Sequence, residues 1–364
     1  MTTPAMLDNI LAQPASHRAV LALHQDAGRA NLRACAEKIR NGLGRVVVTG
    51  MGGSLFAAVP AVSHLQQQGY LAQAVESAEL LHYGSAHLRA ADLGIVISRS
   101  GESIEPVLLA EKMRKAGMTV IGVTNVPGSK LERLAHLTLT IGAQADKLIA
   151  VQTYTGTVLT LLLLAEEVLA GDNHPFSEAC AAALPALSAH IDQCLRAGDS
   201  WQDLLMGGTL YLLGRGPALA SVHEGALLLH ETAKAAAVGM SSGQFRHGPA
   251  EVVSKEFRAV VFGTPPQTQI LDRALADDLF SLGADVRWIG PSRDPGPDPG
   301  EVRHHAPSMV PWPAVPPLLA PLFEIVPLQV AAYRLALWRG ITPGDFRYVS
   351  EVTSSESGFP ASHG

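Results

Sequence analysis

The sequence predicts an α/β protein made of two copies of one unit, each a parallel sheet flanked by helices. Short, continuous apolar segments rich in β-branched residues alternate with helical segments, as strands buried on both faces of a parallel sheet do. Three of these strand segments recur in the same order about 165 residues further along the chain. The length of 364 residues also suits two domains, at roughly 150 residues each.

Each copy begins with a strand, a glycine turn and a helix, and continues with a second strand, a helix and a third strand. In the first copy we expect strands at 45–49, 94–98 and 119–124 and helices at 55–68 and 106–116. In the second copy we expect strands at 209–213, 259–262 and 285–290, one helix that ends at 234 and another at 270–282.

Further helical segments accompany the two copies: an arm at 6–39, a run from 155 to 205 and a last helix at 320–338. The segment 291–313 has seven prolines in 23 residues and no apolar period, so we expect a solvent-exposed loop. We divide the chain into an N-terminal arm (1–39), a first domain (40–200), a second domain (201–342) and a C-terminal tail (343–364).

Composition argues against several classes of protein. Apolar residues make up 47% of the chain and charged residues 16%, which is enough to form large cores. The formal charge is −6, without a lysine or arginine run, so we expect no nucleic-acid partner.

The stretch Val158–Ala165 is too short to span a bilayer, and the N-terminus lacks the basic start of a secretory signal because its first Lys or Arg is Arg18. The three scattered cysteines suit neither a disulfide framework nor a zinc cluster. We therefore expect a cytoplasmic protein that contacts no membrane and holds no metal.

The segment Ser98-Arg-Ser-Gly-Glu-Ser103 follows a predicted buried strand and opens a helix. Ligands of parallel α/β sheets bind outside the carboxyl ends of the strands. N–H groups at a helix N-terminus attract an anion, and Ser98, Ser100 and Ser103 add hydroxyl donors. An ordinary capping turn is the alternative, since serine is a favoured N-cap residue. Arg99 favours the phosphate interpretation, because a guanidinium matches phosphate geometry.

The glycine turn Gly50-Met-Gly-Gly-Ser54 carries less information by itself. The third glycine of a dinucleotide fingerprint is absent, since position 55 is leucine, and no acidic residue follows the next strand in the usual place, which argues against a nicotinamide-dependent enzyme. No triphosphate-binding P-loop is present either, and we expect no cofactor. The turn suits a close approach of the backbone to a small ligand, with Ser54 as a donor.

Two glutamates of the second copy, Glu224 and Glu231, lie seven residues apart on one predicted helix. This spacing is almost two turns, so both carboxylates share a face with Leu228 between them. Two surface glutamates are the alternative, but the apolar neighbours predict a mostly buried helix, and burial raises a carboxyl pKa toward that of a general base. His247 sits in a glycine–proline turn and is of interest only together with these glutamates and the serine-rich loop.

Several segments together resemble the sugar isomerase (SIS) domain family, most closely the tandem isomerase half of glucosamine-6-phosphate synthase and its stand-alone deglycase and deaminase relatives. The resemblance runs in order from about residue 40 to 353 and rests on five motifs: Ser98-Arg-Ser-Gly-Glu-Ser103, Thr124-Asn-Val-Pro-Gly-Ser129, Ala150-Val-Gln-Thr-Tyr-Thr155, Glu224-Gly-Ala-Leu-Leu-Leu-His-Glu231 and Phe245-Arg-His-Gly-Pro249. It implies two tandem SIS domains, each a flavodoxin-like three-layer sandwich, in a homodimer that shares its active site.

The resemblance also implies roles for individual residues. Glu231 would move a proton between C1 and C2 of a phosphosugar, and His247 of a neighbouring subunit would help to open the sugar ring. The remaining positions would bind the phosphate and the sugar: Gly52, Ser54, Ser98, Arg99, Ser100, Ser103, Ala150, Gln152 and Glu351. Because the two halves occupy the chain, we expect a reaction that does not depend on glutamine.

Three positions depart from the synthase pattern, because Leu228, Gln152 and Glu351 stand where lysines are expected. A carboxylate at position 351 cannot form an imine with a sugar carbonyl, so covalent lysine catalysis is not available there. Enolisation by Glu231 and ring opening by His247 need no lysine.

Two functions remain open. One is an isomerase acting on a hexose 6-phosphate or amino-sugar phosphate, with or without release of ammonia or an amine. The other is a phosphosugar-binding sensor without turnover, which the missing lysines favour. The sequence does not select the sugar.

Overall fold

The computed structural model describes residues 5–146, 148–170, 175–292, 306–348 and 352–357. The chain forms two compact units, and each contains segments that are distant in sequence. The first unit comprises residues 12–184 and 345–364, and the second comprises residues 1–11 and 185–344. These units differ from the expected segments, because the N-terminal arm contributes to both units and the division falls after residue 184 rather than 200.

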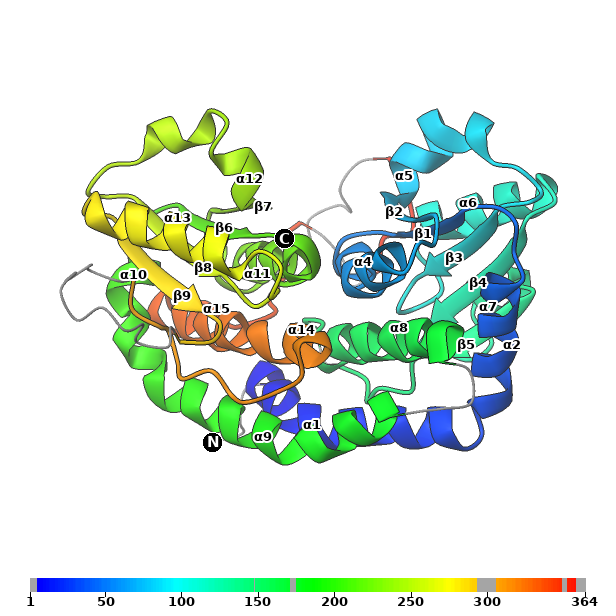
Figure 1. Cartoon of the computed structure of the whole chain (residues 1–364), viewed down its shortest axis with the longest axis horizontal. Helices are drawn as coiled ribbons and strands as arrows, with labels where there is room; N and C mark the ends of the chain where they lie inside the picture. The colour runs from blue at the N-terminus through cyan, green and yellow to red at the C-terminus, as the bar shows by residue number, and fades with distance from the viewer. Residues whose placement is uncertain (1–4, 147, 171–174, 293–305, 349–351, 358–364) are drawn as a thin grey trace. The chain divides into compact units, whose positions relative to one another are not determined.

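A five-stranded parallel sheet forms the centre of the first unit (Figure 1). Its strand order is β2-β1-β3-β4-β5. The bounds are β1 (Val46–Gly50), β2 (Ala72–Glu76), β3 (Leu93–Ile97), β4 (Thr119–Thr124) and β5 (Leu137–Thr140). Every residue of β1 and β3 is buried, as expected for central strands with helices on both faces. The predicted flavodoxin-like arrangement is confirmed for this unit.

Helices cover both faces of this sheet (Figure 1). Helix α6 (Ile104–Lys115) lies over a core that includes Val96 and Val120. The other layer contains α2 (Arg29–Arg40), α4 (Val59–Gln67) and α8 (Gln152–Ala170). The helix expected at 55–68 is divided into α3 (Gly53–Phe56) and α4. The remaining helices are α1 (Ala5–Gln25), α5 (Ser77–Glu79), the π-helix η1 (Leu80–Gly84), the 3₁₀-helix η2 (Ser85–His87) and α7 (Lys130–Leu134).

The second unit repeats the topology with four parallel strands in the order β7-β6-β8-β9. The bounds are β6 (Leu210–Gly214), β7 (Ala237–Ser241), β8 (Arg258–Phe262) and β9 (Asp285–Ile289). Their first residues follow those of β1 to β4 at offsets of 164, 165, 165 and 166 residues. This regular offset confirms that the chain contains one unit twice.

Two helical layers also enclose the second sheet. Leu213 and Val261 face a core under α13 (Gln269–Ser281), while Leu212 faces α11 (Leu219–Ala233) at Gly225. The predicted last helix is two helices, α14 (Ala320–Glu324) and α15 (Val326–Trp338). The other elements are α9 (Pro175–Ala197), η3 (Gly198–Trp201), α10 (Gln202–Met206), η4 (Gly216–Ala218), α12 (Ser242–Phe245), η5 (Pro249–Val252) and η6 (Pro317–Leu319).

Part of the predicted proline-rich loop is ordered along the edge of the second sheet. The N–H of Trp288 donates to Pro307 O at 2.9 Å, and the N–H of Met309 donates to Trp288 O at 2.9 Å. Residues 293–305 of that loop lie outside the described residues. Backbone pairing therefore occupies the edge of β9, where a fifth strand would otherwise lie.

Two helical segments, Gln152–Ala170 and Pro317–Trp338, are long and apolar enough to cross a membrane, which differs from the expectation based on Val158–Ala165. In the structure, 83% and 89% of their apolar windows are buried inside the protein. They serve as core helices within their own units.

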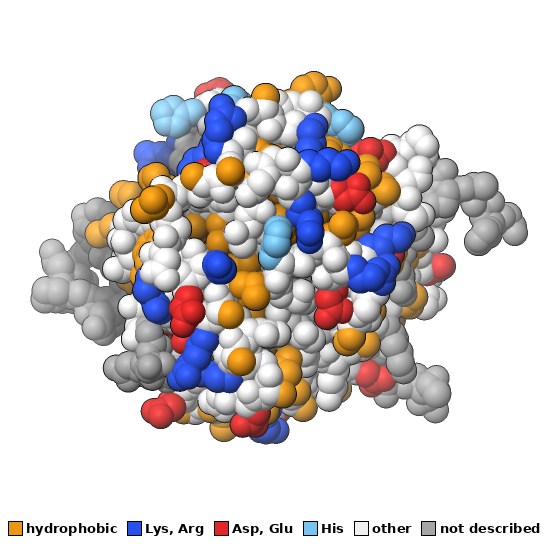
Figure 2. Space-filling model, turned by 90° about the vertical axis from the view of Figure 1, so that its right-hand side faces the viewer, with side chains coloured by type: hydrophobic (Ala, Val, Ile, Leu, Met, Phe, Trp, Pro, Cys, Tyr) orange, Lys and Arg blue, Asp and Glu red, His pale blue; other side chains and the backbone are white. Residues whose placement is uncertain are grey.

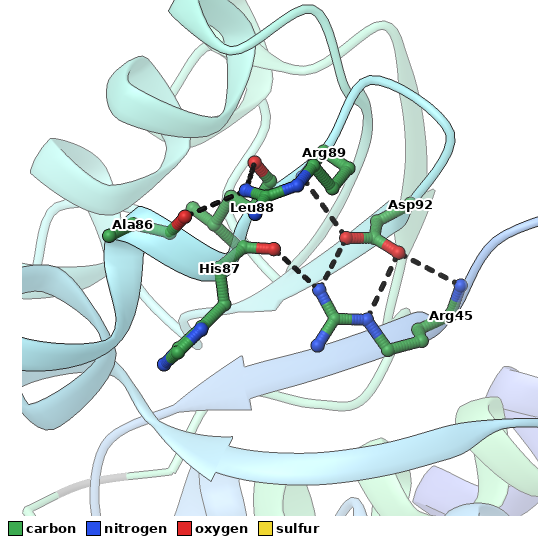
Figure 3. A network of polar contacts seen from close by, with 6 residues as sticks. All are labelled: Arg45, Ala86, His87, Leu88, Arg89 and Asp92. Carbon is green, nitrogen blue, oxygen red and sulfur yellow. Dashed lines mark hydrogen bonds and ion pairs between the residues drawn. The ribbon is translucent and has the colours of Figure 1, made fainter.

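An ion pair joins the amino ends of two strands in the first unit (Figure 3). The serine-rich loop follows the opposite, carboxyl end of β3. Arg45 precedes β1 and Asp92 precedes β3; the guanidinium contacts the carboxylate at 2.6 and 3.1 Å. The backbone N–H of Arg45 donates to the same carboxylate at 3.0 Å. The Arg45 guanidinium holds the pKa of Asp92 below its usual range. This pair fixes the start of the two central strands.

Candidate functional site

The loops that follow β1 and β3 lie at one edge of the first sheet, because these two strands are parallel neighbours. The loop after β1 contains Gly52 and Ser54, and the loop after β3 is Ser98–Ser103. Among the predicted site residues, the structure brings these two groups to the same edge. Such an edge is where a parallel α/β sheet offers a ligand site.

Hydroxyl groups inside the Ser98–Ser103 loop hold its shape. Ser98 is buried; its Oγ accepts from the N–H of Gly101 at 3.1 Å and donates to Ser103 Oγ at 3.3 Å. Ser100 Oγ accepts from the N–H of Glu102 at 3.2 Å. In these contacts the hydroxyls of Ser100 and Ser103 only accept, so each still has its proton to donate. The loop therefore gathers several donors at the N-terminus of the twelve-residue helix α6.

Ser103 occupies the N-cap position of α6, but its side chain makes no capping hydrogen bond. The first N–H of the helix, on Ile104, instead donates to the carbonyl of Thr353 at 3.1 Å. The structure thus does not support the simple capping interpretation for Ser103. It leaves the Ser103 hydroxyl directed into the loop.

Glu102 is the acidic residue of this loop, and it is held by the neighbouring helix α7. Its carboxylate accepts from the N–H of Lys130 at 2.9 Å and lies 3.1 Å from Lys130 Nζ. These hydrogen bonds from Lys130 lower the pKa of Glu102. The negative charge of the loop is thereby paired with a lysine.

The glycine turn after β1 has a backbone that requires glycine. Gly52 has φ +49° and ψ −128°, a conformation that residues with a Cβ avoid. Ser54 and Gly52 are both half-buried. Contact of this turn with a ligand, through its backbone and the Ser54 hydroxyl, stays a prediction.

Ala150 and Gln152 lie beside a carboxylate that the sequence reasoning missed. Asp146 accepts from the N–H groups of Val151, Gln152 and Thr153 at 3.0, 3.0 and 2.9 Å, and so caps helix α8. Burial raises the pKa of Asp146, and these donors oppose the rise. The acidic residue six positions before Gln152 was a detectable signal for this cap.

Glu231, the predicted proton carrier, is half-buried near the C-terminal end of α11 in the second unit. Glu224 and Leu228 on the same helix are buried, so the prediction of a mostly buried helix is confirmed. Lys234 follows with φ +53°, and its ammonium donates to the carbonyl of Glu231. A cation therefore lies next to the backbone of Glu231, although position 228 is leucine.

His247 lies exposed on the turn after α12 in the second unit. Phe245, two residues earlier, is fully buried and contacts Tyr211 and Phe257, with ring centroids 5.9 and 5.7 Å away. The N–H of His247 donates to Gln244 O at 3.0 Å. The turn is thus anchored in the core while the imidazole remains accessible.

Residues 352–357 of the C-terminal tail contact other segments of the first unit. Besides the Thr353 carbonyl, Glu356 Oε1 lies 2.7 Å from His82 Nε2. Glu351, the predicted tail residue of the site, lies outside the described residues. The tail therefore reaches the start of α6, beside the serine-rich loop.

Charged side chains of both signs lie on the face of the molecule that Figure 2 presents. Figure 2 shows Lys and Arg side chains interspersed with Asp and Glu over the face it presents, without a continuous basic field. Arg99 is half-buried within the loop itself. Three or more metal-ligating side chains do not gather anywhere in the part of the chain that the structure describes.

Comparison with known proteins agrees with this architecture. The glutamine–fructose-6-phosphate aminotransferase [isomerizing] of Pyrococcus horikoshii is 31% identical over 324 residues, which are 86% of this chain and 52% of the relative. The chain thus spans about half the length of that curated relative. The C-terminal domain of the Francisella tularensis glucosamine-fructose-6-phosphate aminotransferase superposes with a TM-score of 0.77 at 18% identity, covering 93% of this chain and 97% of that chain. The Thermotoga maritima glucosamine-6-phosphate deaminase superposes with a TM-score of 0.74 at 19% identity, covering 96% of this chain and 99% of that chain.

Two parallel sheets in tandem, with a serine-rich loop after a central strand, define an α/β protein of the tandem sugar-isomerase architecture. Residues 41–166 match the family model described as the SIS domain. The chain therefore contains a SIS domain in its first unit.

Proposed function

We propose that the protein is a phosphosugar isomerase that moves a proton between C1 and C2 of a hexose 6-phosphate or amino-sugar phosphate. The Ser98–Ser103 loop is the observation that carries the proposal. It combines hydroxyl donors, the N-terminus of α6 and Arg99 at the carboxyl end of β3. This combination suits a phosphate dianion. The names of the relatives, which include a deaminase and isomerising aminotransferases, support a phosphosugar as substrate.

Glu231 is the proposed proton carrier. Its carboxylate removes a proton from C1 of the open-chain ketose while the carbonyl oxygen at C2 gains a proton, which gives an enediol. Return of the proton to C2, with loss of the O1 proton, gives the aldose. The step is balanced and needs no oxidant or reductant. Where C2 carries nitrogen, the same proton transfer can precede release of ammonia or an amine.

We propose that two copies of the chain share each site, and one observation in the second unit supports this. Helix α11, which carries Glu231, packs on the face of the second sheet to which the Leu212 side chain points. Phe245, which anchors the turn of His247, belongs to the core on the opposite face, with Leu213. The helix of Glu231 and the aromatic anchor of the His247 turn thus pack on opposite faces of the second sheet. A histidine from a second copy would avoid this separation. We further propose a cytoplasmic location, as suits a phosphosugar substrate.

Substitution of Glu231 by glutamine tests the function. Turnover of a panel of hexose, hexosamine and fructosamine 6-phosphates, with ammonia and ketose release measured in parallel, first identifies the substrate. Glu231→Gln should then lower turnover 10²–10⁴-fold, because a positioned general base contributes that much. The exposed Glu256→Gln in the same unit serves as the matched control.

Two results would contradict the proposal. Turnover by Glu231→Gln within about threefold of wild type would exclude this residue as the base. Calorimetric binding of a sugar phosphate, without solvent-proton exchange at C1 or C2 by NMR, would favour the sensor instead.

A further inference from the structure

A buried ion pair in the second unit lies directly against the turn that carries His247. Arg215 follows β6, and Asp272 belongs to the first turn of α13; Arg215 Nε donates to Asp272 Oδ1 at 3.1 Å. Asp272 is fully buried, whereas the Arg215 side chain is 24% exposed. These residues are 57 positions apart and come from two elements at the carboxyl end of the second sheet.

The pair contacts the turn through its backbone. A Cβ on Gly243 would lie 3.0 Å from a terminal nitrogen of Arg215, so the guanidinium packs on the Gly243 main chain. Ser242, the first residue of α12, faces the Asp272 carboxylate, as does Thr268 before α13. Both partners of the ion pair thus meet consecutive residues of the turn, four and five positions before His247.

The other side of the turn is held by apolar contacts. Phe245 is fully buried and forms a cluster of three rings with Tyr211 and Phe257. The N–H of Arg246 donates to Gly243 O at 3.2 Å, and the N–H of His247 donates to Gln244 O. The aromatic contacts hold the middle of the turn, and the ion pair fixes its first two residues.

We propose that Arg215 and Asp272 are positioning residues for His247, so that they act on opening of the sugar ring and not on the proton transfer itself. This inference rests on the proposed function and on the role in ring opening that the family resemblance implies for His247. A buried ion pair is weak evidence for stability, because desolvation offsets the attraction. The ion pair instead places the backbone of the turn that carries the exposed His247 imidazole, which an apolar pair of the same size would not do. Small displacements of a catalytic group are costly for the rate.

The test compares two ketose substrates. Fructose 6-phosphate closes its ring through the 5-hydroxyl group, whereas 5-deoxyfructose 6-phosphate lacks that group and stays open. Asp272→Asn should lower kcat on fructose 6-phosphate by roughly 10- to 100-fold, the cost of a misplaced catalytic group. Turnover of the open analogue should stay within about twofold of wild type. Arg215→Lys should show the same selectivity, which provides a second variant if Asp272→Asn does not fold.

Asp92→Asn is the matched control, because Asp92 also pairs with an arginine and is 5% exposed, but at the amino edge of the first sheet (Figure 3). It should leave the ratio of the two turnover rates unchanged. Amide hydrogen exchange gives a readout without substrate: the N–H groups of Arg246 and His247 should exchange faster in Asp272→Asn and at the wild-type rate in Asp92→Asn.

Equal losses on both ketoses, or exchange at residues 246 and 247 that Asp272→Asn leaves unchanged, would overturn the positioning role. Wild-type protein that turns over neither ketose nor any other sugar phosphate would instead overturn the proposed function, and this inference with it. Active wild-type protein with an unchanged ratio in both variants would overturn only the inference.

Discussion

Two glycines of the first unit have nearly the same backbone conformation in different surroundings. Gly101, in the serine-rich loop, has φ +67°, and a Cβ there would lie 2.1 Å from Ser129 Oγ. Gly128 has φ +73°, and nothing lies within 4 Å of a Cβ. Both positions disfavour alanine by about 1 kcal/mol for backbone reasons, but only Gly101 also needs the space.

Gly101→Ala should therefore cost clearly more stability than Gly128→Ala, by roughly 1–3 kcal/mol. It should also abolish sugar-phosphate binding, because Ser129 or the loop must move. Urea denaturation and calorimetric titration with the substrate measure both effects. Equal losses of stability in the two variants would show that the contact with Ser129 does not constrain the loop.

At the residue scale, the sequence predicted side chains that are close together in the chain and missed pairs that are distant. Ser98, Ser100 and Ser103 could be found because they share one short loop. The partners Arg45–Asp92 and Arg215–Asp272 are 47 and 57 positions apart. No local sequence pattern predicts such an ion pair, because each of the two residues by itself resembles an ordinary charged surface residue. Glu351, Glu231 and His247 keep the roles assigned to them as predictions.

At the scale of elements, one carboxylate joins three segments of the second unit. Glu324 at the end of α14 is fully buried. It accepts from Ser221 Oγ on α11 at 2.7 Å and from the Thr264 hydroxyl after β8. Burial raises the pKa of Glu324 to about 7, and the two hydroxyl groups oppose the rise.

This raised pKa makes the junction dependent on pH. The folded carboxyl group binds its proton more tightly than the unfolded one, whose pKa is near 4.5. The resulting stabilisation is complete below about pH 4.5 and is lost as the pH rises through 7. Glu324→Gln should remove this dependence, which amounts to at most about 3 kcal/mol. Urea unfolding at several pH values between 5 and 8 measures it; an unchanged pH dependence in the variant would contradict the assignment.

Strand position explains which elements could be predicted. The central strands β1, β3, β4, β6 and β8 are continuous apolar runs, and all were expected within a few residues. The strands β2, β5 and β7 lie at sheet edges and were not expected. Their residues are mostly half-buried, so the apolar signal is weak. The edge strand β9 was found through its large apolar residues and the recurring offset.

At the scale of the whole molecule, three buried histidines contribute to the loss of stability in acid. Burial lowers the pKa of His17, His24 and His190 to about 4, against 6.5 for an ordinary histidine. Between about pH 6.5 and 4, these histidines bind protons in the unfolded chain but not in the folded chain. The free energy of unfolding therefore falls as the pH drops through this range. Each histidine contributes up to roughly 3 kcal/mol to this loss. The effect opposes that of Glu324, and three histidines outweigh one glutamate.

Replacement of His17 should reduce this loss. His17 Nε2 lies 2.9 Å from Thr155 Oγ1, and His17→Gln keeps a polar group there without the titration. The variant should lose less stability than wild type between pH 6.5 and 4, as measured by chemical denaturation. The exposed His87→Gln is the control and should behave as wild type. Identical acid profiles for all three proteins would show that His17 is not responsible.

The doubled architecture could be predicted from the offset of about 165 residues. The set of chain segments that make up each unit could not. Whether a terminal helix joins one unit or the other depends on contacts between segments far apart in the chain, which periodicity does not report. This is why each compact unit combines segments that a division at residues 39 and 200 does not group together.

The hydrogen bond from Ile104 to Thr353 has a consequence for the order of events on the ribosome. The two residues are 249 positions apart, and the whole second sheet is synthesised between them. A nascent chain can thus form the first sheet and the Ser98–Ser103 loop long before the acceptor for the first N–H of α6 exists. The loop that we expect to receive phosphate is therefore completed late in synthesis, after the strands that support it.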